Sequence, residues 1–278
     1  MNILEFSLLI FIGSFCAGFL GALTGLGGGV VIVPLLASVF GIDIRYAIGA
    51  SLVSVIATSC AAASTYIKKG YTNLRLGMFL EVATIGGALI GATIASFISV
   101  KVLTVVLAIV LLYSAYISGK PKPEGTSSEV PSELAVNLKL NGTYPTTEGI
   151  TAYQVHAVPV GFGIMTIAGL LSGLLGIGSG AFKVLAMDQA MGIPFKVSTS
   201  TSNFMIGVTA AASAGVYLAW GYIEPGITMP VMLGVLPGAL LGAKVLVGAK
   251  TQTLRIVFSF VLAAMALKMV YNSLTGGL

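Results

Sequence analysis

Eight apolar runs constrain the fold of this chain more than any other feature. Each has roughly the 20 residues that a helix needs to cross a bilayer; they cover 3–24, 46–67, 77–98, 101–118, 156–175, 197–219, 227–247 and 255–273. Only 8% of the residues are charged, against about 25% in soluble domains. The folded surface must therefore face lipid. We expect an all-α, polytopic protein of the cell membrane, which excludes soluble enzymes, nucleic-acid binders and disordered scaffolds.

Two further apolar runs, 30–40 and 181–191, hold 11 residues each. At 1.5 Å per residue, a helix of this length reaches about 16 Å, roughly half the thickness of a membrane. We expect both segments to be short, tilted or re-entrant. Whether they cross the membrane is left open by their length.

A polar segment, 119–154, divides the chain and begins with GKPKPEGTSSEVPSE. Its Pro, Gly and Ser content is typical of a connection outside the membrane. Within it, Leu134, Val136, Leu138 and Leu140 alternate with other residues before Asn141-Gly142, which weakly predicts a β-hairpin. We therefore divide the chain into a first transmembrane repeat at 1–118, a cytoplasmic polar linker at 119–154 and a second transmembrane repeat at 155–278.

The two halves repeat one another. At a shift of 151 positions, residues 18–116 align with 169–267 without a gap. Two rarer patterns recur: Gly25-x-Gly27-x-Gly29 falls on Gly176-x-Gly178-x-Gly180, and Gly87-Ala88-Leu89-x-Gly91-Ala92 falls on Gly238-Ala239-Leu240-x-Gly242-Ala243. Such self-similarity indicates two copies of one structural unit.

The cations predict how the copies are oriented. Lys68, Lys69 and Arg75 mark a loop whose counterpart in the second copy holds Glu224 as its only charge. Lys and Arg accumulate on the cytoplasmic side, so we expect two inverted repeats of five segments each, with the linker cytoplasmic and both termini extracytoplasmic. This arrangement puts Arg45 and Lys101 outside. It puts nine cations inside: Lys68, Lys69, Arg75, Lys120, Lys122, Lys139, Lys196, Lys250 and Arg255.

Glycines interrupt the helical pattern at matching places, directly before each short run. Glycine-interrupted segments in two inverted halves are typical of secondary transporters. A helix that starts after such a break exposes N–H groups and the positive end of its dipole, and this favours an anion. We expect the breaks to meet near the membrane midplane and to bind an anion there; tight packing alone is the alternative. The predicted site residues are Gly27, Gly28, Gly29, Gly178, Ser179 and Gly180.

The sequence around these breaks resembles a known family. GALTGLGGGVVIVPLL (21–36) and GIDIRYAIGASL (41–52) are similar to the signature of the sulfite exporter TauE/SafE family of membrane permeases, and 173–203 resembles its degenerate second motif. The resemblance covers both halves and implies transport of sulfite, thiosulfate, sulfonates or related small organic anions. One departure is that Val184-Leu185 stands where the first copy has Val33-Pro34, which leaves the shape of 181–191 open.

Lys183 breaks the symmetry, because the first copy has Ile32 at the matching position. A charge inside the membrane is costly and is by default a functional candidate, so we expect Lys183 to contact the anion. Snorkelling to the interface or pairing with Asp188 are the alternatives. Glu81 is expected to snorkel near the start of its run, as are Lys244 and Lys268.

A polar stretch, Ser198–Asn203, opens the run after the second short segment, and Ser51 matches it in the first copy. We expect Ser51, Ser202 and Asn203 to line the anion pathway, with helix–helix hydrogen bonds as the alternative. Thr58 and Thr209 also match across the copies, and an inward orientation would add them to the pathway.

Together these features predict a secondary transporter for a small sulfur-containing anion, working by alternating access. A gated anion channel and a carboxylate permease are the alternatives. The only histidine, His156, lies at the edge of the linker, where we expect an ordinary interfacial residue and a role in proton coupling is the alternative. Cys16 and Cys60 lie apart in apolar runs. We therefore expect no catalytic residues, metal or cofactor. The expected partners are a small inorganic or organic anion and the lipid bilayer, without nucleic acid; oligomeric state, direction and coupling ion are not predicted.

Overall fold

The computed structural model describes residues 3–24, 27–118, 132–146 and 149–248. It also describes eight helical positions near the C-terminus: Ile256, Ser259, Phe260, Ala263, Ala264, Ala266, Leu267 and Tyr271. The rest of the predicted run 255–273, with Lys268, lies outside the described residues. So do Gly25 and residues 119–131 of the linker.

Seven long helices follow the predicted apolar runs, each end within three residues of the expected position. They are α1 (Ile3–Thr24), α3 (Ile44–Lys68), α4 (Leu74–Ala95), α5 (Val100–Ser118), α7 (Val158–Leu175), α9 (Phe195–Ala219) and α10 (Pro225–Gly248). Within the described residues, six helices are long and apolar enough to cross a membrane, namely all of these except α5. The chain is therefore a mostly helical, multi-pass membrane protein, as predicted.

The two short runs have the same compound form. The first is α2 (Gly29–Pro34) followed by the π-helical turn η1 (Leu35–Val39), and the second is α8 (Gly180–Leu185) followed by η2 (Ala186–Ala190). Pro34 ends α2, whereas Leu185 ends α8. The change from α- to π-helical geometry thus occurs at matching positions with and without proline, so the missing proline leaves the shape unchanged.

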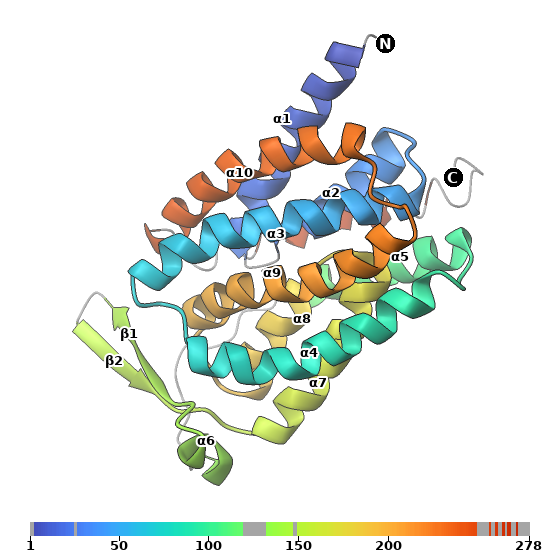
Figure 1. Ribbon diagram of the computed structural model, residues 1–278. Helices are drawn as coiled ribbons and strands as arrows, with labels where there is room; N and C mark the ends of the chain where they lie inside the picture. Colours follow the sequence, from blue (N-terminus) through green and yellow to red (C-terminus); the bar gives the residue numbers. More distant parts are fainter. Residues whose placement is uncertain are drawn as a thin grey trace.

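Glycines bring two pairs of helices into close contact. α1 packs along α10, and α4 packs along α7 (Figure 1). A methyl group placed on Gly87 of α4 would lie 2.1 Å from the carbonyl oxygen of Thr166, and one on Gly238 of α10 would lie 2.1 Å from that of Phe15. Positions 87 and 238 correspond in the repeat, and positions 15 and 166 are related by the same shift of 151 just before the aligned range, so the two copies make equivalent backbone contacts.

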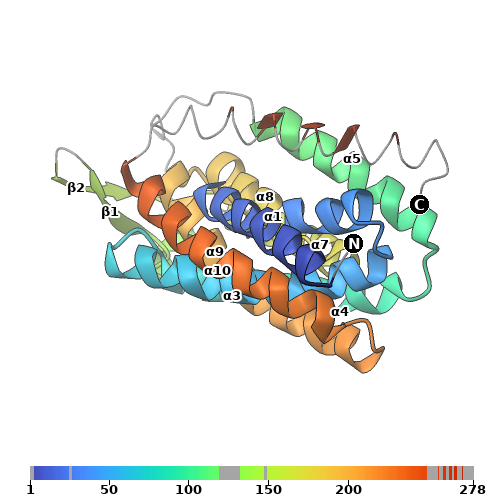
Figure 2. The same cartoon turned by 90° about the horizontal axis from the view of Figure 1, so that it is seen from above.

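Contacts between loops define two ends of the helical bundle. At one end, Arg45 donates hydrogen bonds to the Tyr222 hydroxyl at 3.1 Å and to the Ile98 carbonyl at 3.2 Å. At the other end, Asn73 Nδ2 donates to the Leu140 carbonyl and to the Tyr153 hydroxyl, at 2.8 Å each. The loop with Lys68, Lys69 and Arg75 therefore lies at the linker end. The start of α1 lies at the end away from the hairpin in both views (Figures 1 and 2).

The linker forms a short helix and a hairpin. α6 (Glu133–Asn137) precedes the antiparallel strands β1 (Gly142–Thr146) and β2 (Gly149–Tyr153), with Gly142 opposite Tyr153. A hairpin was expected, but its predicted position was wrong: the alternating stretch 134–140 contains α6, and Asn141-Gly142 leads into β1. The Asn141 side chain accepts a hydrogen bond from Val155 N at 2.8 Å, which ties the start of β1 to the chain beyond β2. The fold is thus not strictly all-α.

The centre of the bundle is formed by α3 and α9, which pack on each other and on the two short segments. Both helices carry buried hydroxyl side chains within this apolar core. On α3 these are Ser51, Ser54, Thr58 and Ser59, and on α9 they are Ser198, Thr199, Ser200, Thr201, Ser202, Thr209 and Ser213. Buried hydroxyl groups at this density require hydrogen-bond partners, and they bring polar chemistry to the point where the glycine breaks lie.

Candidate functional site

The two glycine breaks lie against each other between α3 and α9. Gly27 and Gly178 adopt φ values of +76° and +71°, in the left-handed region that favours glycine. A methyl group on either one would lie 2.8 Å from Ile206 Cγ2, and Val55 Cγ1 would be 3.5 Å and 3.3 Å away, respectively. Val55 and Ile206 are themselves equivalent in the repeat. The same pair of side chains therefore contacts both breaks.

The residue before each short helix is also left-handed. Gly28 has a φ of +70°, and its counterpart Ser179 has a φ of +47°. For a residue with a Cβ, this conformation costs on the order of 1–3 kcal/mol. Ser179 is only 1% exposed, and its Oγ has no hydrogen-bond partner within the described part of the chain. Backbone strain and an unsatisfied buried hydroxyl coincide at this break, as they do at ligand sites.

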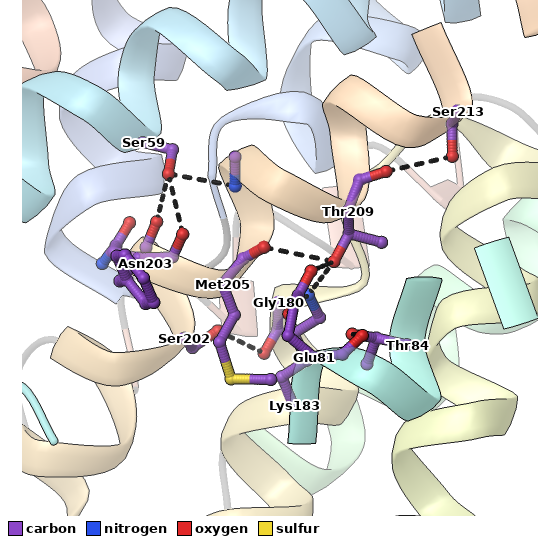
Figure 3. Close-up of polar contacts among 12 residues, drawn as sticks. Ser59, Glu81, Thr84, Gly180, Lys183, Ser202, Asn203, Met205, Thr209 and Ser213 are labelled. Atoms are coloured by element: carbon purple, nitrogen blue, oxygen red, sulfur yellow. Dashed lines mark hydrogen bonds and ion pairs between the residues drawn. The ribbon is translucent and has the colours of Figure 1, made fainter. Parts of the chain in front are cut away.

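The matching serines of α3 and α9 contact the breaks of the second copy. Ser51 Oγ donates to the carbonyl oxygen of Gly176 at 2.8 Å. Figure 3 shows the bond of Ser202 Oγ to the carbonyl oxygen of Gly180, at 3.4 Å. A methyl group on Gly29 would lie 2.8 Å from Ser51 Oγ. The structure thus gathers Gly29, Ser51, Gly180 and Ser202 around the two breaks.

Asn203, the last predicted contact, is fully buried one position beyond Ser202. Its Nδ2 donates to the Thr199 carbonyl at 3.1 Å, and its backbone carbonyl accepts from Ser59 Oγ, which also accepts from Gly207 N at 3.0 Å (Figure 3). Asn203 Oδ1 and Thr199 Oγ1 have no partner among the described residues. This turn of α9 therefore keeps buried polar atoms available for a ligand.

Lys183 is fully buried and forms an ion pair that was not predicted from the sequence. Its Nζ lies 3.4 Å from Glu81 Oε2, and it also donates to Thr209 Oγ1, which in turn donates to Glu81 Oε1 (Figure 3). The three side chains come from α8, α4 and α9. The two alternatives considered for Lys183, snorkelling and pairing with Asp188, are therefore wrong, and its contact with the anion stays a prediction. The expectation that Glu81 would snorkel is also wrong, because Glu81 is 4% exposed.

The start of α4 explains the error at Glu81. The helix begins at Leu74, three residues before the expected start, so Glu81 lies seven residues into it, about 10 Å along its axis. A signal was present in the sequence: three acids, Glu5, Glu81 and Asp188, fall within apolar runs. A buried lysine needs an acid, and Glu81 was a candidate of equal standing with Asp188.

The remaining candidates have other partners or surroundings. Thr58 is buried, and its hydroxyl donates to the Ser54 carbonyl of its own helix at 2.8 Å. His156 is buried beside the linker, where its backbone N donates to the Met191 carbonyl at 3.0 Å. Lys244 is exposed. Over the described residues, no group of three or more His, Cys, Asp or Glu side chains could hold a metal ion.

Comparison with known proteins gives a consistent result. The family model described as "Sulfite exporter TauE/SafE" matches residues 10–269. The probable membrane transporter protein YunE of Bacillus subtilis is 26% identical over 98% of this chain and 99% of its own length. The probable membrane transporter protein ORF9 of a Sinorhizobium species is 23% identical over 97% of this chain and 95% of its own. No solved structure matches the chain at a significant level.

Proposed function

The chain belongs to the sulfite exporter TauE/SafE family, and on that premise we propose that it is a secondary transporter that carries a small sulfur-containing anion by alternating access. Relatives that align over nearly their whole length are named probable membrane transporters. The six membrane-length helices agree with that class. The family description names sulfite, and we propose thiosulfate and small sulfonates beside it as small sulfur oxyanions of similar chemistry.

The observation that carries this proposal is the meeting of two equivalent helix breaks at a buried, hydroxyl-rich junction. Broken helices that meet between two repeats are the usual binding sites of secondary transporters. The Ser179 hydroxyl, buried and without a partner in the described part of the chain, is able to donate a hydrogen bond to an oxyanion. Ser51, Ser202 and Asn203 add polar groups around the same junction, and Lys183 lies about one helical turn beyond Gly180.

The equivalent contacts of the two copies support alternating access. α1 against α10 and α7 against α4 are the same pairing, exchanged between the copies. We propose that the copies are inverted in the membrane and that they exchange their conformations around the junction. The positively charged loop at the linker end and the position of Arg45 at the other end agree with this orientation.

Uptake into proteoliposomes tests the function. We expect saturable uptake of at least one of labelled thiosulfate, sulfite and methanesulfonate, with counterflow when the same unlabelled anion is inside. A gated channel would give flux without saturation or counterflow, and a carboxylate permease would respond to small carboxylates alone. Absence of flux for every anion would overturn the proposal.

Serine variants locate the site. Replacing Ser179 with alanine removes the hydroxyl that is free to donate to the anion, and replacing Ser202 with alanine removes a hydroxyl that would turn from the Gly180 carbonyl to donate to it. For either change we expect the KM to rise about tenfold, which corresponds to about 1.4 kcal/mol. The matched control is Ser64→Ala, because Ser64 is an exposed serine of α3. An unchanged KM in both Ser179→Ala and Ser202→Ala would remove these residues from the site.

A further inference from the structure

The fold does not require the ion pair of Lys183 and Glu81 for its stability. Taking two charges out of water costs several kcal/mol per ion, and their attraction often fails to repay that cost. Lys183 belongs to the second copy and Glu81 to the first, and the positions equivalent to them hold Ile32 in the first copy and Met232 in the second. The symmetry-related positions are therefore both occupied by apolar side chains. Ionisable residues inside a membrane typically mark paths for ions or protons, which points to a role in transport.

The pair also lies next to the proposed anion site. Lys183 follows Gly180 by three residues on α8, about 4.5 Å along the helix axis. The Gly180 carbonyl accepts the hydrogen bond of Ser202 (Figure 3). Through Thr209, the pair joins α4, α8 and α9. A change in the charge of either partner would therefore act directly on the junction where the breaks meet.

Charge balance suggests how an anion could use Lys183. In the structure, Lys183 and Glu81 together have no net charge, so an anion added to this pair would bring a net negative charge into a low-dielectric site. Protonation of Glu81 avoids this net negative charge. The carboxylate takes up one proton and becomes a neutral acid, while Lys183 keeps its positive charge and loses its partner. A monovalent anion can then replace the carboxylate beside Lys183, and the loaded site is as neutral as the empty one.

We propose that Glu81 is the proton-binding site of the transporter, and that the chain carries its anion together with one proton. This inference rests on the proposed function and names its coupling ion. Protonation of Glu81 releases Lys183 for the anion, and departure of the anion lets the deprotonated Glu81 pair with Lys183 again. A monovalent anion then moves without net charge, whereas thiosulfate moves with one net negative charge.

Few other ionisable groups lie on the elements that pack against α4 and α8. The packed elements are α5, α7, α9 and η2. α7 contains no ionisable side chain. The others contribute Lys101, Tyr113 and Tyr116 from α5, Lys196 and Tyr217 from α9, and Asp188 from η2. In the described part of the chain, Lys183 is the ion-pair partner of Glu81, so protonation of Glu81 changes the net charge of this pair by one.

Proton movement in wild-type proteoliposomes tests the proposal. The vesicles enclose the pH dye pyranine, and valinomycin with equal potassium on both sides holds the membrane potential at zero. We expect external methanesulfonate or thiosulfate to acidify the lumen at the rate of anion uptake. At equilibrium, an inside-alkaline difference of one pH unit should accumulate methanesulfonate about tenfold. Saturable anion uptake without luminal acidification would overturn proton coupling but leave the proposed function intact. No saturable uptake at any pH would overturn the proposed function itself.

Substitution of Glu81 tests whether the coupled proton binds to this residue. Glu81→Gln keeps a neutral side chain of similar shape, so we expect counterflow to persist while luminal acidification and pH-driven accumulation are lost. Glu224→Gln is the matched control, since it makes the same substitution at an exposed acid before α10, and it should keep proton coupling. If Glu81→Gln does not fold, Glu81→Gln with Lys183→Gln removes both charges and should abolish luminal acidification. Accumulation equal to wild type in a folded Glu81→Gln protein would overturn the assignment.

Discussion

Thr209 is the residue that connects the ion pair to the central helix α9. Its hydroxyl accepts a hydrogen bond from Lys183 and donates one to Glu81. Hydrogen bonds to charged groups contribute more than those between neutral groups, about 1.5–3 kcal/mol. The hydroxyl therefore offsets part of the cost of burying the pair, and it holds the carboxylate and the ammonium in one arrangement.

Replacing Thr209 with valine should lower stability by about 1–3 kcal/mol, because both charged groups lose a partner without access to water. Thr58→Val is the control at the equivalent position, where only the bond to the Ser54 carbonyl is lost. Thermal unfolding of the detergent-solubilised variants measures the difference. Equal destabilisation by the two substitutions would contradict the role given to Thr209.

At the scale of elements, two neighbouring glycines of α4 allow the effect of helix packing on stability to be measured apart from the effect of helix propensity. Gly87 faces the Thr166 carbonyl of α7, so an alanine methyl would meet backbone at 2.1 Å, whereas a methyl on Gly86 has no atom within 4 Å. We expect Gly87→Ala to force α4 and α7 apart and to cost about 1–3 kcal/mol. Gly86→Ala should be neutral or stabilising by up to about 1 kcal/mol. Thermal unfolding compares them, and similar melting temperatures would show that this contact does not hold the helices together.

The linker is attached to the bundle through Tyr153 and Asn73. Burial raises the pKa of the Tyr153 hydroxyl above its ordinary value, and the hydrogen bond from Asn73 Nδ2 opposes this in part. The folded state therefore favours the neutral phenol. The resulting stabilisation is complete below about pH 10, the ordinary pKa of tyrosine, and is lost as the pH rises through the higher pKa of the folded protein.

Tyrosinate absorbance tests this pH dependence. The difference at 295 nm between wild type and Tyr153→Phe isolates this one residue, and we expect it to titrate above pH 10 in the folded protein. The same difference in the denatured protein is the control and should titrate near pH 10. A midpoint at or below pH 10 in the folded protein would mean that the phenol is not buried against α4.

Local patterns predicted the helices well but not their partners. A run of about 20 apolar residues fixes a membrane helix almost by itself, and so all seven long helices in the described ranges were predicted. Glu81 and Lys183 are 102 positions apart, and no local pattern indicates which acid a buried lysine will meet. The hairpin was misplaced for a similar reason, since the Asn141 side chain bonds to Val155 beyond the second strand.

The candidate site was likewise predicted in part: its residues were predicted, but their contacts with one another were not. The glycine breaks and the serines of α3 and α9 were predicted from the repeat, and the structure gathers them at one junction. The hydrogen bonds of Ser51 to Gly176 and of Asn203 to Ser59 depend on how the copies pack, which the repeat alone does not specify. Their role in binding an anion remains a prediction that the transport measurements test.

At the scale of the whole molecule, the inverted orientation can be tested by labelling. Lys69, before α4, and Glu224, before α10, are both exposed and lie in corresponding loops of the two copies. In a protein with Cys16 and Cys60 replaced by alanine, we expect Glu224→Cys to react with a membrane-impermeant maleimide on intact cells. Lys69→Cys should react only after permeabilisation. Reaction of both from the same side would exclude inversion.

The Lys183–Glu81 pair has apolar residues, Ile32 and Met232, at the two equivalent positions, and this asymmetry has a consequence for the resting protein. If two identical copies exchanged conformations, the inward-open and outward-open forms would have the same free energy and would be equally populated. In the proposed mechanism, the exchange would give the charged pair the surroundings of its apolar counterpart, so the two forms would differ in free energy. A difference of about 1.4 kcal/mol is enough to leave ten molecules open to one side for each one open to the other. The binding site of the unloaded carrier would therefore be open mainly to one side of the membrane.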